Sequence, residues 1–168
     1  MMILNVFKNL ARWLTQPLNQ KSAGGNASEE NLTSEDSLTF LREVLQTVED
    51  SNGDANVVYP LLEQNLEKLD GNLVQTLQTW ATPALRESED KECIAVVIFQ
   101  FGNLIQQFPL GSRADNLEIA IVAYQLALQV FTRDAFEDSN GDANVVYPLL
   151  EQNLEKLDGN LVQTLQTW

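Results

Sequence analysis

Residues 49–80 have the sequence "EDSNGDANVVYPLLEQNLEKLDGNLVQTLQTW", and residues 137–168 repeat it without one substitution. Large apolar side chains recur in the first copy at spacings of four, four and three residues, the period of one helix face. They are Val58, Leu62, Leu66 and Leu69. The segments on either side show the same period, and none shows strand-like alternation over a useful length. The sequence therefore predicts an all-α helical bundle of antiparallel helix pairs.

Turn and capping residues divide the first copy into two helices. Asn52-Gly53 forms a turn, and Asp54 is a good N-cap for the helix that follows. Gly71 is the expected C-terminal stop of that helix, and Asn72 is the expected cap of the next one. Each copy is thus predicted to be a helical hairpin.

The stretch "DKECIAVVIFQFGNLIQQF" at 90–108 is apolar on nearly all sides. Such a helix usually forms the buried centre of a bundle, so it is predicted to be the most buried element, with Phe101 in the core. Cys93 is expected to be a small buried hydrophobe within it. Ser112 and Asp115 form a capping box that begins the following helix.

The N-terminal part divides into a helix and a linker. Residues 1–16 separate into an apolar side and a polar side with Lys8 and Arg12, which predicts an amphipathic helix. It could lie on a membrane surface, but a helix this short more often docks onto its own protein or onto a partner helix. Residues 17–34 lack periodicity and are predicted to be a flexible linker. Thr33 and Asp36 then form a capping box at the start of the next helix.

The remaining chain is predicted to form a helical domain at 35–136 and the duplicated helical hairpin at 137–168. Packing alone does not require identical exposed residues, so a recent or deliberate duplication explains the two copies better than diverged repeats. We expect the first copy to occupy the core and the second to stack at the end of the bundle. The alternative is that the second copy takes the equivalent site in a neighbouring molecule, giving a swapped homo-oligomer.

Composition excludes several functions. The net charge is -14 and the isoelectric point is near 4.1, so nucleic acid and anionic lipid are repelled. The chain has one cysteine and no histidine, which excludes a disulfide within the chain, histidine-dependent triads and dyads, and nitrogen-ligated zinc. Apolar runs are too short for a membrane span, and no signal peptide is recognised. A cytoplasmic protein without enzyme activity or cofactor is expected.

Oxygen-bearing side chains in "DSNGDAN" match part of a calcium-binding loop. However, Ala55 stands where that loop needs glycine, and Leu61 stands where it needs a bidentate glutamate. We therefore predict a turn followed by an N-cap, and no metal site. The matching side chains are Asp50, Asn52, Asp54 and Asn56 in the first copy and Asp138, Asn140, Asp142 and Asn144 in the second. The acidic stretch "ESED" at 87–90 is predicted to be solvated charge at a helix start.

The stretch "AIVAYQLAL" at 120–128 resembles the second helix of a tetratricopeptide repeat. Ala120, Tyr124 and Ala127 occupy the small, aromatic and small positions of that pattern. Residues 38–136 more broadly resemble the N-terminal region of cyanobacterial tetratricopeptide proteins, many of which end in a CHAT (caspase-like) peptidase domain. The sequence departs from that family at Glu137, before the tandem repeats and the peptidase domain, and it has no histidine for the peptidase dyad.

The resemblance implies a helical protein–protein interaction module, a fragment of a larger scaffold, whose protein partner and binding residues the sequence does not identify. Two alternatives remain: a membrane-surface or assembly element anchored by residues 1–16, and an inert duplicated fragment.

Overall fold

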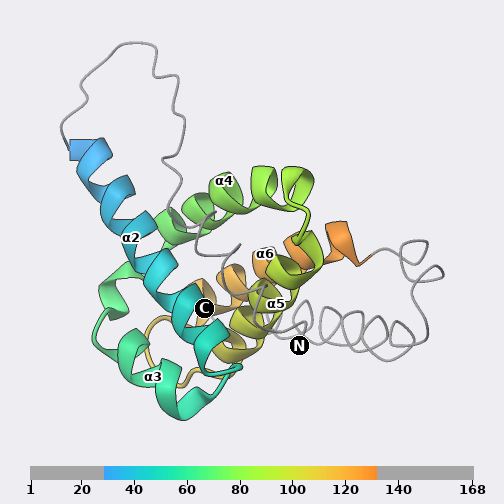
Figure 1. The fold of residues 1–168 in the computed structure, drawn as a ribbon. Helices are drawn as coiled ribbons and strands as arrows, with labels where there is room; N and C mark the ends of the chain where they lie inside the picture. Colours follow the sequence, from blue (N-terminus) through green and yellow to red (C-terminus); the bar gives the residue numbers. More distant parts are fainter. Residues whose placement is uncertain (1–28, 132–168) are drawn as a thin grey trace.

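The structure is a computed structural model that describes residues 29–131, with the side chains of 35–131. Within this part of the chain every regular element is helical and no strand is present, which confirms the all-α prediction (Figure 1). The predicted helix at 1–16 and the second copy at 137–168 lie outside the described residues. The elements are α2 (Glu29–Asp50), α3 (Ala55–Glu63), the 3-10 helix η1 (Leu66–Lys68), α4 (Gly71–Glu87), α5 (Lys91–Gln107) and α6 (Arg113–Val130).

Helix α2 begins earlier than the sequence predicted. Its first residue is Glu29, so residues 29–34 belong to the helix and the predicted linker 17–34 is too long at its C-terminal end. Thr33 and Asp36 lie inside α2, and the prediction that they cap its start was wrong. Glutamate is a good helix former and is favoured in a first turn, which explains why Glu29 and Glu30 extend the helix beyond that capping pattern.

Between the Asn52-Gly53 turn and α4, the first copy contains an α-helix and a separate 3-10 helix where the sequence predicted one continuous helix. Asp54 caps α3 as expected, and its carboxylate accepts a hydrogen bond from the Asn56 N–H at 2.9 Å. Helix α3 nevertheless ends at Glu63, well before Gly71. The Asn65 side chain donates to the Leu61 carbonyl at 2.9 Å, and such a local bond competes with continuation of the helix.

Gly71 is the first residue of α4 and not the last residue of a preceding helix, so its predicted role was wrong. The cap of α4 is Asp70, not Asn72. One carboxylate oxygen of Asp70 accepts from the Asn72 N–H at 3.0 Å and from the Leu73 N–H at 3.1 Å. Two otherwise unpaired N–H groups of the first turn are thereby satisfied.

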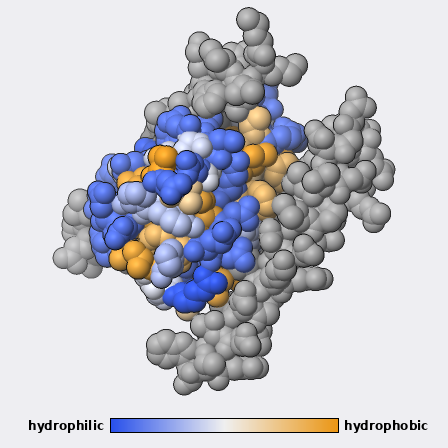
Figure 2. All heavy atoms as spheres, turned by 90° about the horizontal axis from the view of Figure 1, so that it is seen from below, coloured by the Kyte–Doolittle hydropathy of each residue, from blue (hydrophilic) through white to orange (hydrophobic). Residues whose placement is uncertain are grey.

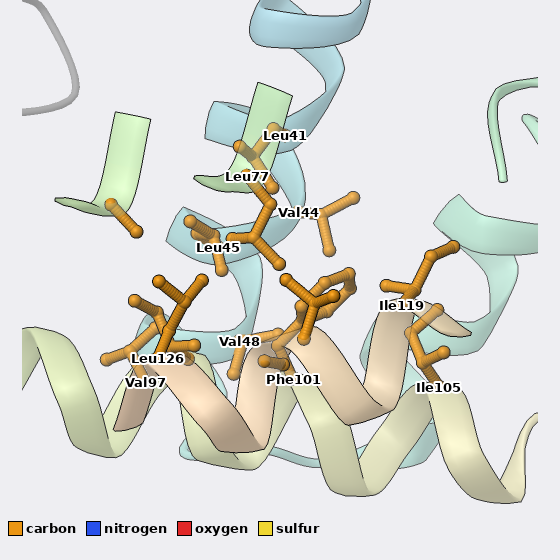
Figure 3. Close-up of a cluster of buried hydrophobic side chains, with 14 of the residues drawn as sticks. Leu41, Val44, Leu45, Val48, Leu77, Val97, Phe101, Ile105, Ile119 and Leu126 are labelled. Atoms are coloured by element: carbon orange, nitrogen blue, oxygen red, sulfur yellow. The ribbon is translucent and has the colours of Figure 1, made fainter. Parts of the chain in front are cut away.

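The core lies where α2, α4, α5 and α6 meet (Figure 3). Phe101 on α5 is fully buried, as predicted, and Leu45 and Val48 of α2 belong to the same buried cluster. Helix α6 is the most buried element, with ten buried residues against eight in α5. The prediction that 90–108 would be the most buried was therefore wrong. Both helices pack against α4 and against each other, but α5 exposes 41% of Val96, whereas every large apolar side chain of α6 is at least partly buried.

The first copy of the repeat lies in the core, as predicted. Of its eleven large apolar side chains, the seven that are buried come from α3, the turn before α4, and α4. They are Val58, Leu62, Leu69, Leu73, Val74, Leu77 and Trp80. Tyr59, Leu61 and Leu66 pack against this core from the side, and only Val57 among the eleven is exposed, at 49%.

Candidate interaction surface

Helices α5 and α6 form a tightly packed hairpin. A Cβ atom on Gly102 would lie 3.2 Å from both the Ala123 Cβ and the Tyr124 Cε1, so the absent side chain allows the two helices to approach closely. Ala120, Tyr124 and Ala127 are all fully buried in α6. The three positions that the sequence marked as small, aromatic and small are therefore interior positions of the bundle.

Tyr124 joins the two helices through its ring and its hydroxyl. Its ring centroid lies 5.4 Å from that of Phe99 on α5. Its hydroxyl lies within hydrogen-bond distance of Asn103 Oδ1 and, at 3.1 Å, of Gln106 Oε1. Burial raises the pKa of Tyr124 well above its usual value, so the phenol stays neutral and can donate to these amides.

The least buried side of each helix carries a mixed apolar and amide stripe. We call the two stripes together the outer face: Val96, Phe99 and Asn103 on α5, and Ile121, Gln125 and Leu128 on α6. Residues three or four apart share one side of a helix, and Tyr124 contacts Phe99 and Asn103 from between the stripes. Phe99, Ile121 and Leu128 are partly buried against the core, whereas Val96 and Gln125 are exposed.

Acidic side chains flank the outer face. Glu92 lies one turn before Val96 on α5, and Glu118 lies one turn before Ile121 on α6; both are exposed. The whole chain carries a net charge of -14. On the side of the molecule that Figure 2 shows, small groups of hydrophobic residues are likewise set among hydrophilic ones. An apolar stripe bordered by carboxylates is complementary to a ligand with apolar and basic groups.

A second cluster lies where the end of α2 meets the start of α5. Both carboxylate oxygens of Glu49 are shielded from solvent, and they have no hydrogen-bond partner among the described residues. Burial, and then the charge of Asp50, raises the pKa of Glu49 to about 7. Sequence reasoning missed the shielding of the Glu49 carboxylate, because it depends on how α2 packs against the other helices.

Cys93 is half-buried in this cluster, and not fully buried as the sequence predicted. Burial raises the pKa of its thiol, and the nearby charges of Asp90, Glu92 and Glu49 raise it further. Since the thiolate is the reactive form, this environment makes Cys93 a weak nucleophile.

The first "DSNGDAN" loop has the geometry of a turn and a helix cap. Asn52 and Gly53 have φ angles of 53° and 75°, and the Gly53 N–H donates to the Val48 carbonyl at 2.8 Å. This closes the C-terminus of α2. Asp54 caps α3, and its Oδ1 also accepts from the Asn56 side chain at 3.0 Å. The loop of the second copy lies outside the described residues.

Residues 29–131 contain no group of three or more metal-binding side chains. No helix there combines the length and apolarity needed to cross a membrane. In "ESED", Ser88 is buried and ends α4, while Asp90 is the residue before α5. The stretch thus serves as the connection between two helices.

Comparisons with protein-family models, curated proteins and solved structures find no match to this chain.

Proposed function

We propose that this chain is a non-enzymatic helical module that binds another protein in the cytoplasm, and that the outer face of the α5–α6 hairpin is its binding surface. The observation that carries this proposal is the combination on one hairpin of an exposed Val96 and the partly buried Phe99, Ile121 and Leu128. Aromatic and large aliphatic side chains at the centre of a surface, with polar groups around them, are typical of interface anchors.

The packing of the hairpin supports a tetratricopeptide-like unit within a larger scaffold. The tetratricopeptide pattern pairs Leu-Gly in its first helix with a small and an aromatic residue in its second. In Phe101-Gly102 the glycine of the first element is present and Phe stands in place of Leu, and Ala120 with Tyr124 matches the second element. Gly102 is in close contact with α6, as that pattern requires. Modules of this kind bury one stripe of each helix pair and leave a face open for partners.

Charge defines the chemistry of the partner. Glu92 and Glu118 border the apolar stripe, so a partner segment with large apolar side chains flanked by lysine or arginine fits best. Steering by the acidic surface should make association faster at low ionic strength.

Two exposed valines provide a matched test. Val96 belongs to the outer face and is 41% exposed, whereas Val57 lies on α3 and is 49% exposed. A partner captured by the wild-type chain would be purified, and its affinity measured by calorimetry for Val96→Asp and Val57→Asp. We expect Val96→Asp to weaken binding at least tenfold and Val57→Asp to leave it unchanged. Equal affinities for the two variants would contradict the assignment of the binding surface.

A further inference from the structure

The first copy of the repeat runs along α5 from its middle to the turn that leads into α6. Near its start, a Cβ on Gly53 would lie 3.6 Å from the Gln100 side chain, in the middle of α5.

The same path continues to the far end of the hairpin. The Tyr59 hydroxyl donates to the Leu104 carbonyl at 3.3 Å, and its ring centroid lies 5.1 Å from that of Phe108. Leu66 then reaches the turn between α5 and α6, since its side chain would lie 3.6 Å from a Cβ on Gly111. The receptor of the repeated segment is therefore formed by the hairpin together with α2, against which α3 and α4 also pack.

The chain leaves α6 about two turns of α5 away from Gln100, where the contacts of the first copy begin. Gly102 on α5 lies against Ala123 on α6, and the helices are antiparallel, so the last turn of α6 is level with the first turn of α5 (Figure 1). Only residues 132–136 separate Phe131 from Glu137, where the second copy starts. Five extended residues span up to about 17 Å, which exceeds the roughly 11 Å that two helical turns cover along α5.

We propose that segment 137–168 is an alternative occupant of the site that segment 49–80 fills in the same chain, so that the protein has two mutually exclusive folded states. The two segments are identical, so the second carries every side chain through which the first contacts the receptor. A short tether gives the second copy a high effective concentration at this site, which favours it over the same segment of another molecule. This inference is independent of the proposed binding partner.

Chain continuity makes the first copy the major occupant. Helix α4 runs without interruption from Gly71 to Glu87 and so crosses the end of the first copy at Trp80. Ala81, Ala84 and Leu85, which follow, are buried in the core. Docking of the second copy would separate these residues from the first part of α4. The second state therefore becomes dominant only when the first copy is weakened.

The identical copies permit matched variants of the full chain. Leu62 is fully buried, and Leu150 is its equivalent in the second copy. Leu62→Asp places a charge in the core and disables the first copy, whereas Leu150→Asp disables only the second. Leu62→Asp, Leu150→Asp and the double variant are compared with the wild type. Urea unfolding monitored by circular dichroism measures the stability of each, and analytical ultracentrifugation measures its association state.

We expect Leu150→Asp to unfold like the wild type. Leu62→Asp should keep a cooperative transition at lower urea and remain a monomer, with a midpoint that does not change over a hundredfold range of protein concentration. The double variant should lose the cooperative transition. The proposal is overturned if Leu62→Asp, like the double variant, shows no cooperative transition. It is also overturned if the double variant keeps the same transition as Leu62→Asp. If the unfolding midpoint of Leu62→Asp rises with protein concentration and the variant forms dimers, the second copy exchanges between molecules. That result would also overturn the proposal.

Discussion

Replacing Glu49 by glutamine should stabilise the protein above neutral pH and have little effect in acid. The carboxylate oxygens of Glu49 are shielded and lack a hydrogen-bond partner among the described residues, so the ionised form is costly. The pKa of Glu49 is raised from 4.5 to about 7. Below pH 4.5 the carboxyl group is protonated in both states and costs nothing. Because the folded-state pKa lies above the unfolded value, stability falls as the pH rises from 4.5, and the loss is complete above about 7.

The size of the effect follows from the same shift. A change from 4.5 to about 7 corresponds at full strength to about 3 kcal/mol, at about 1.4 kcal/mol for each unit of pKa. Glu49 is only half-buried, and solvent screening reduces this to about 1–2 kcal/mol. Glutamine keeps the shape of the side chain and removes the charge, so Glu49→Gln should gain about this free energy of unfolding at pH 8 and almost none at pH 4.5.

Urea unfolding monitored by circular dichroism at several values between pH 4.5 and pH 8 measures the difference between variant and wild type. Taking this difference cancels the pH dependence that the other carboxylates contribute to both proteins. Glu137 is the equivalent residue in the second copy, and Glu137→Gln is the matched control. A Glu49→Gln difference that is the same at both ends of the range, or that Glu137→Gln reproduces, would refute the reasoning.

Two further predictions concern the core and a helix cap. Phe101 is fully buried, so Phe101→Ala should lower the free energy of unfolding by about 3–5 kcal/mol; a loss below about 1 kcal/mol in urea unfolding would contradict its place in the core. Asp70→Ala should cost about 1 kcal/mol, since Asp70 accepts hydrogen bonds from two N–H groups at the start of α4. Asp158→Ala, the same change in the second copy, should leave thermal unfolding unchanged, and equal losses for the two variants would show that Asp70 has no special capping role.

Local chemistry in the sequence was sufficient for the fold class and for several helix boundaries. The turn at Asn52-Gly53 with its cap at Asp54, and the cap at Ser112, were predicted from residues within one helical turn of the bonds they make. Such bonds join near neighbours, so their pattern can be recognised without knowledge of the tertiary structure.

Competing local signals were harder to rank. Asp70, Gly71 and Asn72 all have properties of residues at helix ends, and the sequence assigned the stop to Gly71 and the cap to Asn72. The structure ends α3 earlier, at Glu63, and assigns the cap to Asp70. The candidate binding surface was also beyond sequence reasoning, because the exposure of Val96 depends on which sides of α5 are covered by other helices.

The sequence alone determined that the described chain is helical, that a helix lies at about 90–108, and that the chain carries two identical segments. Only the tertiary structure decided that α6 is more buried than α5, and that both carboxylate oxygens of Glu49 are shielded from solvent. The physical reason is the distance along the sequence over which each kind of interaction acts. Backbone capping and helix periodicity act within a few residues, whereas burial and a carboxylate's pKa depend on side chains that distant parts of the chain bring together.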